Sequence, residues 1–230
     1  MQKYAIIVAG GTGTRMGGTL PKQFMLLKDR PVLYYTLKAF LEAYDDLHII
    51  LVLPADHKTA GEEIVHGYFD KTRFSITTGG DTRFQSVKNG LALVEKESVI
   101  FVHDAVRCLV SKELIHRCYK QAHKTGTAVP AIPSKDSIRL LREEKSEAFD
   151  RNNVMLVQTP QTFQSKILLP AYQVDYKVEF TDEATVIEAN GGEIFLVEGE
   201  EDNIKITKPV DLLIAERVLE DRGRNLTSDV

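Results

Sequence analysis

Short apolar runs alternate with amphipathic segments along most of the chain. Runs rich in β-branched residues predict strands at 5–8, 48–53, 74–77, 99–102, 127–132, 193–197 and 203–206. One helical face is marked by Leu33, Leu37, Phe40, Leu41 and Tyr44, behind a helix start at Pro31. Capping residues predict three more helices, from Ser111 to Gly126, from Thr181 to about Gly191, and from Thr207 to about Arg222.

This alternation predicts an α/β fold, a mainly parallel twisted sheet flanked by helices on both faces. Functional loops are then expected at the carboxyl ends of the strands. The sequence has no internal repeat, low-complexity tract or linker rich in proline and serine. We therefore expect residues 1–230 to form a single domain.

Residues 135–161 interrupt the pattern, because they indicate two strands joined by a charged turn. The tip of this segment, 142–147, carries only charged or small side chains. A projecting β-hairpin arm at 135–158 is the prediction. Since two-stranded hairpins are marginally stable alone, we expect the arm to pack on a second subunit and form a homodimer. A solvated hairpin lying on its own domain is the alternative.

Composition limits the possible partners. The chain has a net charge of −4, with 43% hydrophobic and 27% charged residues, which gives no general attraction to nucleic acid or to an anionic membrane. The N-terminus enters a predicted strand without a signal or transit peptide, and no apolar run is long enough to span a bilayer. We expect a cytoplasmic protein. Cys108 and Cys118 are too few for a disulfide framework.

The richest chemical signal is the glycine loop after the first strand, AGGTGTRMGGTLPKQ. The loop does not match the dinucleotide fingerprint, because Met16 occupies the sixth position counted from Gly11. The P-loop pattern also fails: Gly13 and Gly18 have its spacing, but Thr19 stands where its lysine must be.

The loop is nevertheless suited to phosphate. Glycines allow successive backbone N–H groups to surround an anion. Arg15 offers a planar fork to two phosphate oxygens, while Lys22 is a compact point charge. A phosphate-binding role is therefore favoured over a purely structural turn.

These residues open a series of motifs that resembles a known enzyme family. AGGTGTRMG with PKQ is similar to the start of nucleotidyltransferases that make activated sugars and polyols. GGDTRFQSVKNGL (79–91), HDAVR (103–107), DRN (150–152), QTPQ (158–161), TDEA (181–184) and DNIKIT (202–207) follow in order. Together they resemble the 2-C-methyl-D-erythritol 4-phosphate cytidylyltransferase family, which implies a fold like that of the nucleotide-diphospho-sugar transferases.

The resemblance implies transfer of CMP from CTP to a small polyol phosphate, with release of pyrophosphate. A phosphate monoester has a second pKa near ~6, so the attacking group is already a dianion at neutral pH and needs no general base. The requirement is in-line positioning and neutralisation of two anions. This fits a sequence with scattered cations and no Ser/His/Asp or Cys/His arrangement.

The resemblance also implies a role for particular residues. Arg15 and Lys22 stabilise charge on the α-phosphate, and Arg151 and Lys205 position the attacking phosphate, with Arg151 supplied by the neighbouring subunit. The residues implied for CTP are Ala9, Gly10, Gly11, Gly13, Gly80, Asp81, Ser86 and Asp104. Those implied for the substrate are Arg107, Ser137, Arg151, Thr181 and Lys205.

Several of these residues have plainer interpretations. Residues 79–81 can be a turn before a helix cap, Asp104 and Arg107 can be an ion pair that braces a loop, and Lys205 can be an outward-facing strand residue. The family usually has proline after the arginine of HDAVR, where this chain has Cys108, so a less rigid loop is expected.

The histidines show no zinc-like spacing. We expect Mg²⁺ instead, held mainly by the CTP phosphates, with Asp104 as the candidate protein ligand. Two alternatives stay open. One is a ribitol-5-phosphate cytidylyltransferase, which the loop at 10–13 resembles somewhat. The other is a nucleotide-binding regulator without catalysis, against which stand the four cations Arg15, Lys22, Arg151 and Lys205.

Overall fold

A computed structural model describes residues 1–10, 20–143 and 145–225 of the chain. Its largest element is an eight-stranded sheet with the order β10-β7-β11-β6-β1-β4-β5, and β12 also pairs with β7. The strands of this sheet are β1 (Gln2–Val8), β4 (Leu47–Leu53), β5 (Phe74–Thr78), β6 (Ser98–Asp104), β7 (Thr127–Pro133), β10 (Met155–Val157), β11 (Gln161–Gln164) and β12 (Leu196–Glu198). The helices are α1 (Val32–Ala43), α2 (Lys58–Tyr68), α3 (Arg83–Leu91), α4 (Lys112–Thr125), α5 (Ser165–Ala171), α6 (Glu183–Ala189) and α7 (Pro209–Asn225).

The sheet is parallel at its centre and mixed at one side. β1 pairs in parallel with β4 and β6, and β4 pairs in parallel with β5. β11 runs antiparallel between β6 and β7, and β10 is antiparallel to β7. The predicted α/β fold with a mainly parallel core is confirmed.

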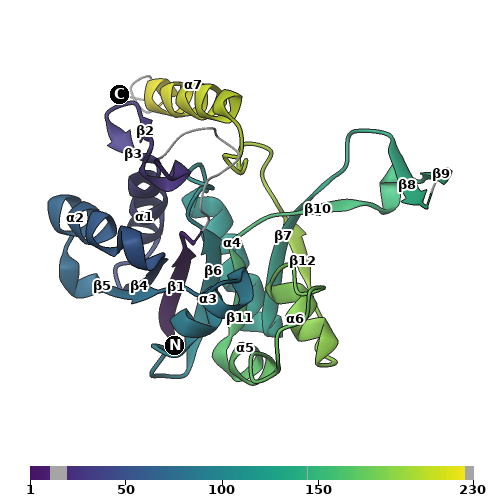
Figure 1. The fold of residues 1–230 in the computed structure, drawn as a ribbon, viewed down its shortest axis with the longest axis horizontal. Helices are drawn as coiled ribbons and strands as arrows, with labels where there is room; N and C mark the ends of the chain where they lie inside the picture. The colour runs from purple at the N-terminus through teal and green to yellow at the C-terminus, as the bar shows by residue number, and fades with distance from the viewer. Residues whose placement is uncertain (11–19, 144, 226–230) are drawn as a thin grey trace.

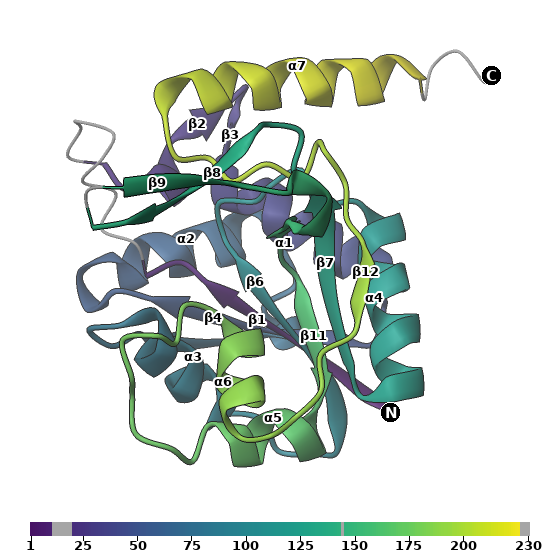
Figure 2. The ribbon, with the colours of Figure 1, turned by 90° about the vertical axis from the view of Figure 1, so that its right-hand side faces the viewer.

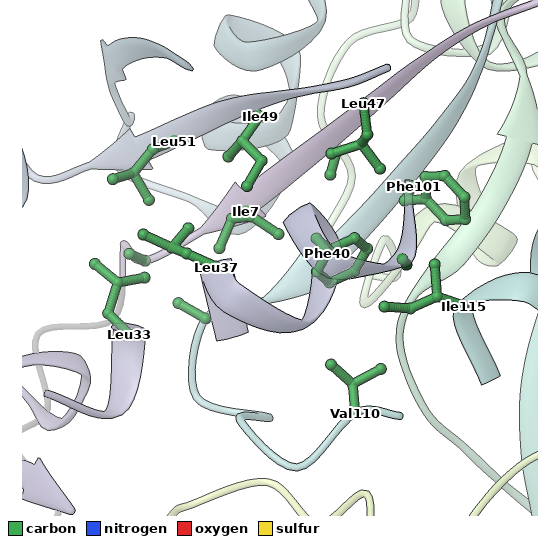
Figure 3. Packing of buried hydrophobic residues seen from close by; sticks show 14 of the residues in the cluster. Ile7, Leu33, Leu37, Phe40, Leu47, Ile49, Leu51, Phe101, Val110 and Ile115 are labelled. Carbon is green, nitrogen blue, oxygen red and sulfur yellow. The ribbon is translucent and has the colours of Figure 1, made fainter. Parts of the chain in front are cut away.

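Successive residues of the central strands face opposite sides of the sheet, and helices cover both sides. Ile7 and Ile49 face α1, α2 and α4, where Phe40 of α1 packs on Phe101 with ring centroids 5.8 Å apart; Figure 3 shows this layer. The other side, which includes Ile6, packs on α3, α5 and α6. β1, β4 and β6 are mostly apolar because helices bury both of their faces.

α7 lies across the top of the molecule in Figure 2, over the carboxyl ends of the central strands. Ala215 of α7 packs in a third apolar cluster with Val32, Leu109 and Ile206. Asp211 accepts hydrogen bonds from the backbone N–H of Thr207 at 2.7 Å and of residue 208 at 2.8 Å. These contacts fix the chain just before the helix.

Two predicted elements are wrong in detail. Residues 203–206 are not a strand. They cross the end of the sheet, where the Ile206 N–H donates to the Val106 carbonyl at 3.0 Å and the Asn203 carbonyl accepts from Arg107 Nη1 at 2.8 Å. The cap of α6 is Asp182 rather than Thr181, because Asp182 and Thr185 form a reciprocal capping box. Ser111 and left-handed Gly126 bound α4 as predicted.

The predicted hairpin is present as β8 (Ile138–Arg142) and β9 (Lys145–Phe149), which pair antiparallel and project from the body in Figure 1. Its base is closed where the N–H of Ser134 donates to the Val154 carbonyl at 3.1 Å. β10 returns the chain to the main sheet. Leu141 near the tip is 80% exposed and Phe149 is 41% exposed, so part of the arm's apolar surface faces solvent.

Candidate active site

Residues predicted to hold the nucleotide meet at the carboxyl ends of β1 and β5. Ala9 and Gly10 follow β1, and Gly79 and Gly80 follow β5. Ser86 of α3 lies between them: its hydroxyl oxygen accepts from the Gly80 N–H at 3.1 Å, and a Cβ added to Gly10 would lie 3.4 Å from it. A Cβ on Gly79 would come within 2.7 Å of the same oxygen, so any larger residue at position 79 would displace the Ser86 hydroxyl.

A second group of polar residues surrounds Asp104, the last residue of β6. Its Oδ2 lies 2.8 Å from Lys205 Nζ and 3.7 Å from Arg107 Nε, and its Oδ1 lies 3.3 Å from Arg83 Nε. The Asp104 side chain is only 11% exposed. The predicted ion pair between Asp104 and Arg107 is therefore present, as one contact of a larger cluster.

Charge controls the ionisation of Asp104. Burial opposes the charged form, but the positive charges of Arg83 and Lys205 outweigh it and hold the pKa of Asp104 well below its usual range. Asp104 is thus an anion wherever the protein is folded near neutral pH. Its negative charge is paired with the protein's own Arg83, Arg107 and Lys205.

The segment 203–207 joins this cluster to the glycine loop. Lys22 Nζ donates to the Thr207 carbonyl at 2.9 Å, and Arg107 Nη1 donates to the Asn203 carbonyl at 2.8 Å. Lys205 lies between these two anchor points and reaches Asp104. Two predicted cations, Lys22 and Arg107, therefore bond to the short stretch of backbone that carries the third, Lys205.

His103 supports the cluster from inside the protein. It is fully buried, and its Nε2 lies 3.1 Å from the Arg107 carbonyl, which can only accept, so Nε2 carries the proton. Its Nδ1 accepts from the Thr159 hydroxyl at 3.0 Å, and that hydroxyl accepts from the Asp104 N–H at 3.2 Å. Burial lowers the pKa of His103 to about 3, so the ring is neutral.

We predict that this histidine makes folding stability depend on pH. Its pKa is lower in the folded state than the ordinary value of about 6.5, so the unfolded chain binds the additional proton as the pH falls. Between about pH 7.5 and about pH 5.5, the His103 contribution should reduce the free energy of unfolding by about 1.4 kcal/mol.

Urea unfolding of the wild type and of His103→Asn at both pH values measures this term. The wild type should lose about 1.4 kcal/mol more than the variant over the interval. His48, whose pKa burial also lowers, is present in both proteins and cancels. Equal losses in the two proteins would contradict a neutral, buried His103.

Other predicted site residues lie apart from this cluster. Arg151 is exposed at the base of the arm and donates to the Lys135 carbonyl at 2.8 Å, and Ser137 is exposed beside β8. Thr181 is exposed directly before the capping residue of α6, and Asp81 is exposed in the turn before α3, whose cap is Thr82.

Three predicted site residues fall in the part of the glycine loop between residues 11 and 19. Gly11, Gly13 and Arg15 lie outside the described residues. Their predicted roles are therefore carried by the sequence alone.

The sequence prediction missed Arg83 and Glu183, although both lie in the quoted motifs. Arg83 Nη2 donates to Glu183 Oε2 at 3.0 Å, and its Nη1 contacts the other oxygen of Glu183. The Glu183 side chain is completely buried. A charged residue in the first turn of a helix is usually solvated or near a cap, so the sequence contained no signal that these two would pair inside the protein.

The described residues contain no cluster of metal-binding side chains, and both cysteines are buried. Across residues 1–10, 20–143 and 145–225, no three His, Cys, Asp or Glu side chains are grouped so that they could hold a metal ion. Cys108 and Cys118 are buried free thiols, and burial raises the pKa of each to about 12, so neither is a nucleophile at neutral pH. No helix in the described part of the chain could cross a membrane.

Comparison with known proteins identifies the family. The model of the IspD family, 2-C-methyl-D-erythritol 4-phosphate cytidylyltransferase, matches residues 4–221. The enzyme of that name from Phocaeicola vulgatus is 46% identical over 94% of this chain and 99% of its own length. The one from Bacteroides fragilis is 45% identical over 95% of this chain and 100% of its own length.

Solved structures agree with the sequence matches. The crystal structure of 4-diphosphocytidyl-2C-methyl-D-erythritol synthase from Anaerococcus prevotii aligns with a TM-score of 0.82 at 28% identity, covering 95% of this chain and 98% of that one. The Thermus thermophilus 2-C-methyl-D-erythritol 4-phosphate cytidylyltransferase aligns with a TM-score of 0.74 at 29% identity, again covering 95% and 98%. The resemblance inferred from the motifs is confirmed: this chain belongs to the 2-C-methyl-D-erythritol 4-phosphate cytidylyltransferase family and is a cytidylyltransferase.

Proposed function

We propose that the cluster around Asp104 and the segment 203–207 carries out CMP transfer from CTP to 2-C-methyl-D-erythritol 4-phosphate. A phosphate oxygen of the substrate bonds to the α-phosphorus of CTP, the bond from that phosphorus to the bridging oxygen breaks, and pyrophosphate leaves. The product is 4-diphosphocytidyl-2-C-methyl-D-erythritol, an intermediate of the non-mevalonate route to isoprenoids. The convergence of Lys22, Arg107 and Lys205 is the observation that carries the proposal.

The attacking group explains why cations suffice. The substrate phosphate is largely a dianion at neutral pH, since its second pKa is near ~6, and it must approach a triphosphate of the same sign. Fixed positive charges reduce that repulsion and stabilise the charge that develops at the α-phosphate. His103 is buried, neutral and bonded at both nitrogens, so it does not act as the base.

On the nucleotide side, Lys22 and Arg15 would stabilise the α-phosphate, and the backbone of Ala9–Gly13 would hold the triphosphate. Ser86 and Gly80, with Asp81 beside them, would form the site for the base. The glycine-lined corner around Ser86 supports this, because a planar base needs close approach to the backbone.

On the substrate side, Lys205 and Arg107 would bind the phosphate and polyol, and Thr181 would add a hydroxyl. Lys205 is 45% exposed although its ammonium contacts Asp104. A phosphate dianion can therefore reach Lys205 without disturbing the core. Asp104 would hold the ribose.

The same carboxylate fits a role toward Mg²⁺. One carboxylate, rather than a cage of acidic residues, is what a magnesium ion held mainly by nucleotide phosphates requires. Asp104 would be the protein residue that holds the ion. When bound, the ion supplies further neutralisation of the triphosphate.

The arm would complete the site of a second copy of the chain. Ser137 and Arg151 lie on or beside a hairpin that projects from the body, and both are exposed (Figure 1). A homodimer formed through the 135–158 arm would bring Arg151 to the partner's substrate phosphate.

This arrangement predicts rescue between two inactive subunits. Lys22→Ala and Arg151→Ala each remove a cation from every site of their own homodimers. In mixed dimers, one site loses both residues and the other keeps both, so about half of the active-site capacity of that species should return. Pyrophosphate release from mixtures refolded together measures it. Mixtures no more active than the average of the two variants would contradict the assignment of Arg151 to the partner site.

The substrate itself is tested with purified protein, Mg²⁺ and CTP. We expect rapid pyrophosphate release with 2-C-methyl-D-erythritol 4-phosphate and little with ribitol 5-phosphate. The opposite preference would establish the ribitol enzyme, and no release with either would leave a nucleotide-binding regulator.

A further inference from the structure

Arg83, the first residue of α3, connects the two halves of the site. Its guanidinium contacts two carboxylates from distant elements: Glu183 at the start of α6 and Asp104 at the end of β6. We infer that Arg83 is a positioning residue, which orients Asp104 and keeps it aligned with the substrate-side segment 181–183. The inference rests on the proposed function, because the roles of Asp104 and Lys205 come from it.

The contact with Glu183 fixes the guanidinium in place. Glu183 is fully buried, and the Tyr172 hydroxyl donates to its Oε1 at 3.1 Å. Phe84 stacks on Tyr172 with centroids 4.7 Å apart and on Phe180 at 5.6 Å. A carboxylate held in such an aromatic wall cannot turn toward water, so both Nη atoms of Arg83 are held with it.

The remaining donor, Nε, faces the reaction site. It lies 3.3 Å from Asp104 Oδ1, whereas Lys205 and Arg107 approach Asp104 Oδ2. Arg83 therefore determines which oxygen is left for Lys205. Without it, the carboxylate could rotate and bind Lys205 with both oxygens, and that lysine would be less available to the substrate phosphate.

Only arginine can make this set of contacts. Its planar fork presents Nε and both Nη atoms along fixed directions, while a lysine offers one point charge. The Arg83 side chain is 26% exposed, so it lies at the edge of the site rather than wholly in the core. Its two Nη contacts already neutralise Glu183, which leaves Nε for Asp104.

The same arginine joins the nucleotide side to the substrate side. Ser86 and Gly80 are one turn of α3 and a short loop away from it. On the other side, Gln161 fixes the start of α6, since its amide donates to Asp182 Oδ2 at 2.8 Å and its carbonyl accepts from the Ala184 N–H at 2.9 Å. A movement at either end is therefore transmitted to Asp104.

The test compares Arg83→Lys with Arg73→Lys. Arg73 is a matched control. It also holds its position by several hydrogen bonds, to the backbone carbonyls of Leu47 and Tyr44, but at the amino end of β4, away from the candidate site at the carboxyl ends of the strands. Both variants should melt at lower temperature than the wild type. At saturating CTP and 2-C-methyl-D-erythritol 4-phosphate, Arg83→Lys should lose about 10- to 100-fold in kcat, with both KM values within about threefold. Arg73→Lys should keep its kcat.

A double-mutant cycle with Asp104→Asn provides the readout that a purely structural role would not move. If Arg83 acts through Asp104, Arg83→Lys should lower kcat by less than about twofold once Asp104 is replaced. Independent, multiplicative losses would overturn the inference. Should Arg83→Lys fail to fold, Glu183→Gln takes its place, because it frees the guanidinium from its anchor and should lower kcat at least about fivefold.

The outcomes separate this inference from the proposed function. A wild-type chain that forms no product refutes the function itself. An active wild type with an equally active Arg83→Lys variant refutes only the role of Arg83.

Discussion

Replacing Lys22 by alanine is expected to lower kcat about 10²- to 10³-fold, equivalent to ~3–4 kcal/mol of lost transition-state stabilisation. Lys22 stands near the end of the glycine loop, and its ammonium lies 2.9 Å from the Thr207 carbonyl, beside the predicted position of the phosphates. The hydrogen bond to Thr207 contributes about 1 kcal/mol to stability, and the variant is expected to fold.

Steady-state pyrophosphate release measures the effect, with Lys58→Ala as the control. Lys58 forms an exposed pair with Glu62 on α2 at 4.0 Å, and its loss should leave kcat unchanged. Circular dichroism of both variants shows whether they are folded. A kcat for Lys22→Ala within threefold of the wild type would remove Lys22 from the mechanism.

Asp104→Asn should have the largest effect on stability, about 3 kcal/mol or more in the free energy of unfolding. The change leaves Arg107 and Lys205 beside an amide instead of a carboxylate, at a position where the side chain is 11% exposed. Removing one partner of a buried ion pair costs about 3–5 kcal/mol. The lower end is expected because Lys205 reaches solvent and Arg83 keeps Glu183.

The stability difference between Asp104→Asn and the wild type should depend on pH. The pKa of Asp104 is lower in the folded protein than in the unfolded chain, so its stabilising effect is present above the ordinary value of about 3.8 and is lost as the pH falls further. Urea unfolding at neutral pH should therefore separate Asp104→Asn from the wild type, and the gap should narrow below about pH 4. Asp221→Asn, which breaks an exposed pair with Arg217 on α7, should change stability by less than about 1 kcal/mol. Equal stability of Asp104→Asn and the wild type would show that the cluster is not held by this charge.

Much of the fold follows from local pattern. β1, β4 and β6 each contain a continuous apolar run, and α1 and α4 carry clear start or stop signals. Short β10 and β11 escaped prediction because three or four residues that pair antiparallel with distant strands have no periodicity of their own. The segment 203–206 has β-branched residues but is held by side chains across the end of the sheet, so tertiary contacts overrode its propensity.

The site residues also separate into those that local motifs predicted and those that only tertiary contacts reveal. Asp104, Lys205, Arg107 and Lys22 were found because they stand in motifs, and the structure brings them together. The pairing of Arg83 with Glu183 joins residues 100 positions apart. The two side chains meet because α3 and α6 lie together in the fold, and no spacing rule along the sequence predicts that contact.

In the proposed mechanism, fixed cations assemble two anions, and the substrate phosphate needs no base from the protein. The pH dependence of kcat/KM for 2-C-methyl-D-erythritol 4-phosphate tests it most directly. We predict one ionisation near the second pKa of a phosphate monoester, about 6, followed by a plateau from about pH 7 to about pH 8.5. A second ionisation within that range, removed by substitution of a protein side chain, would reveal a general base and contradict the account.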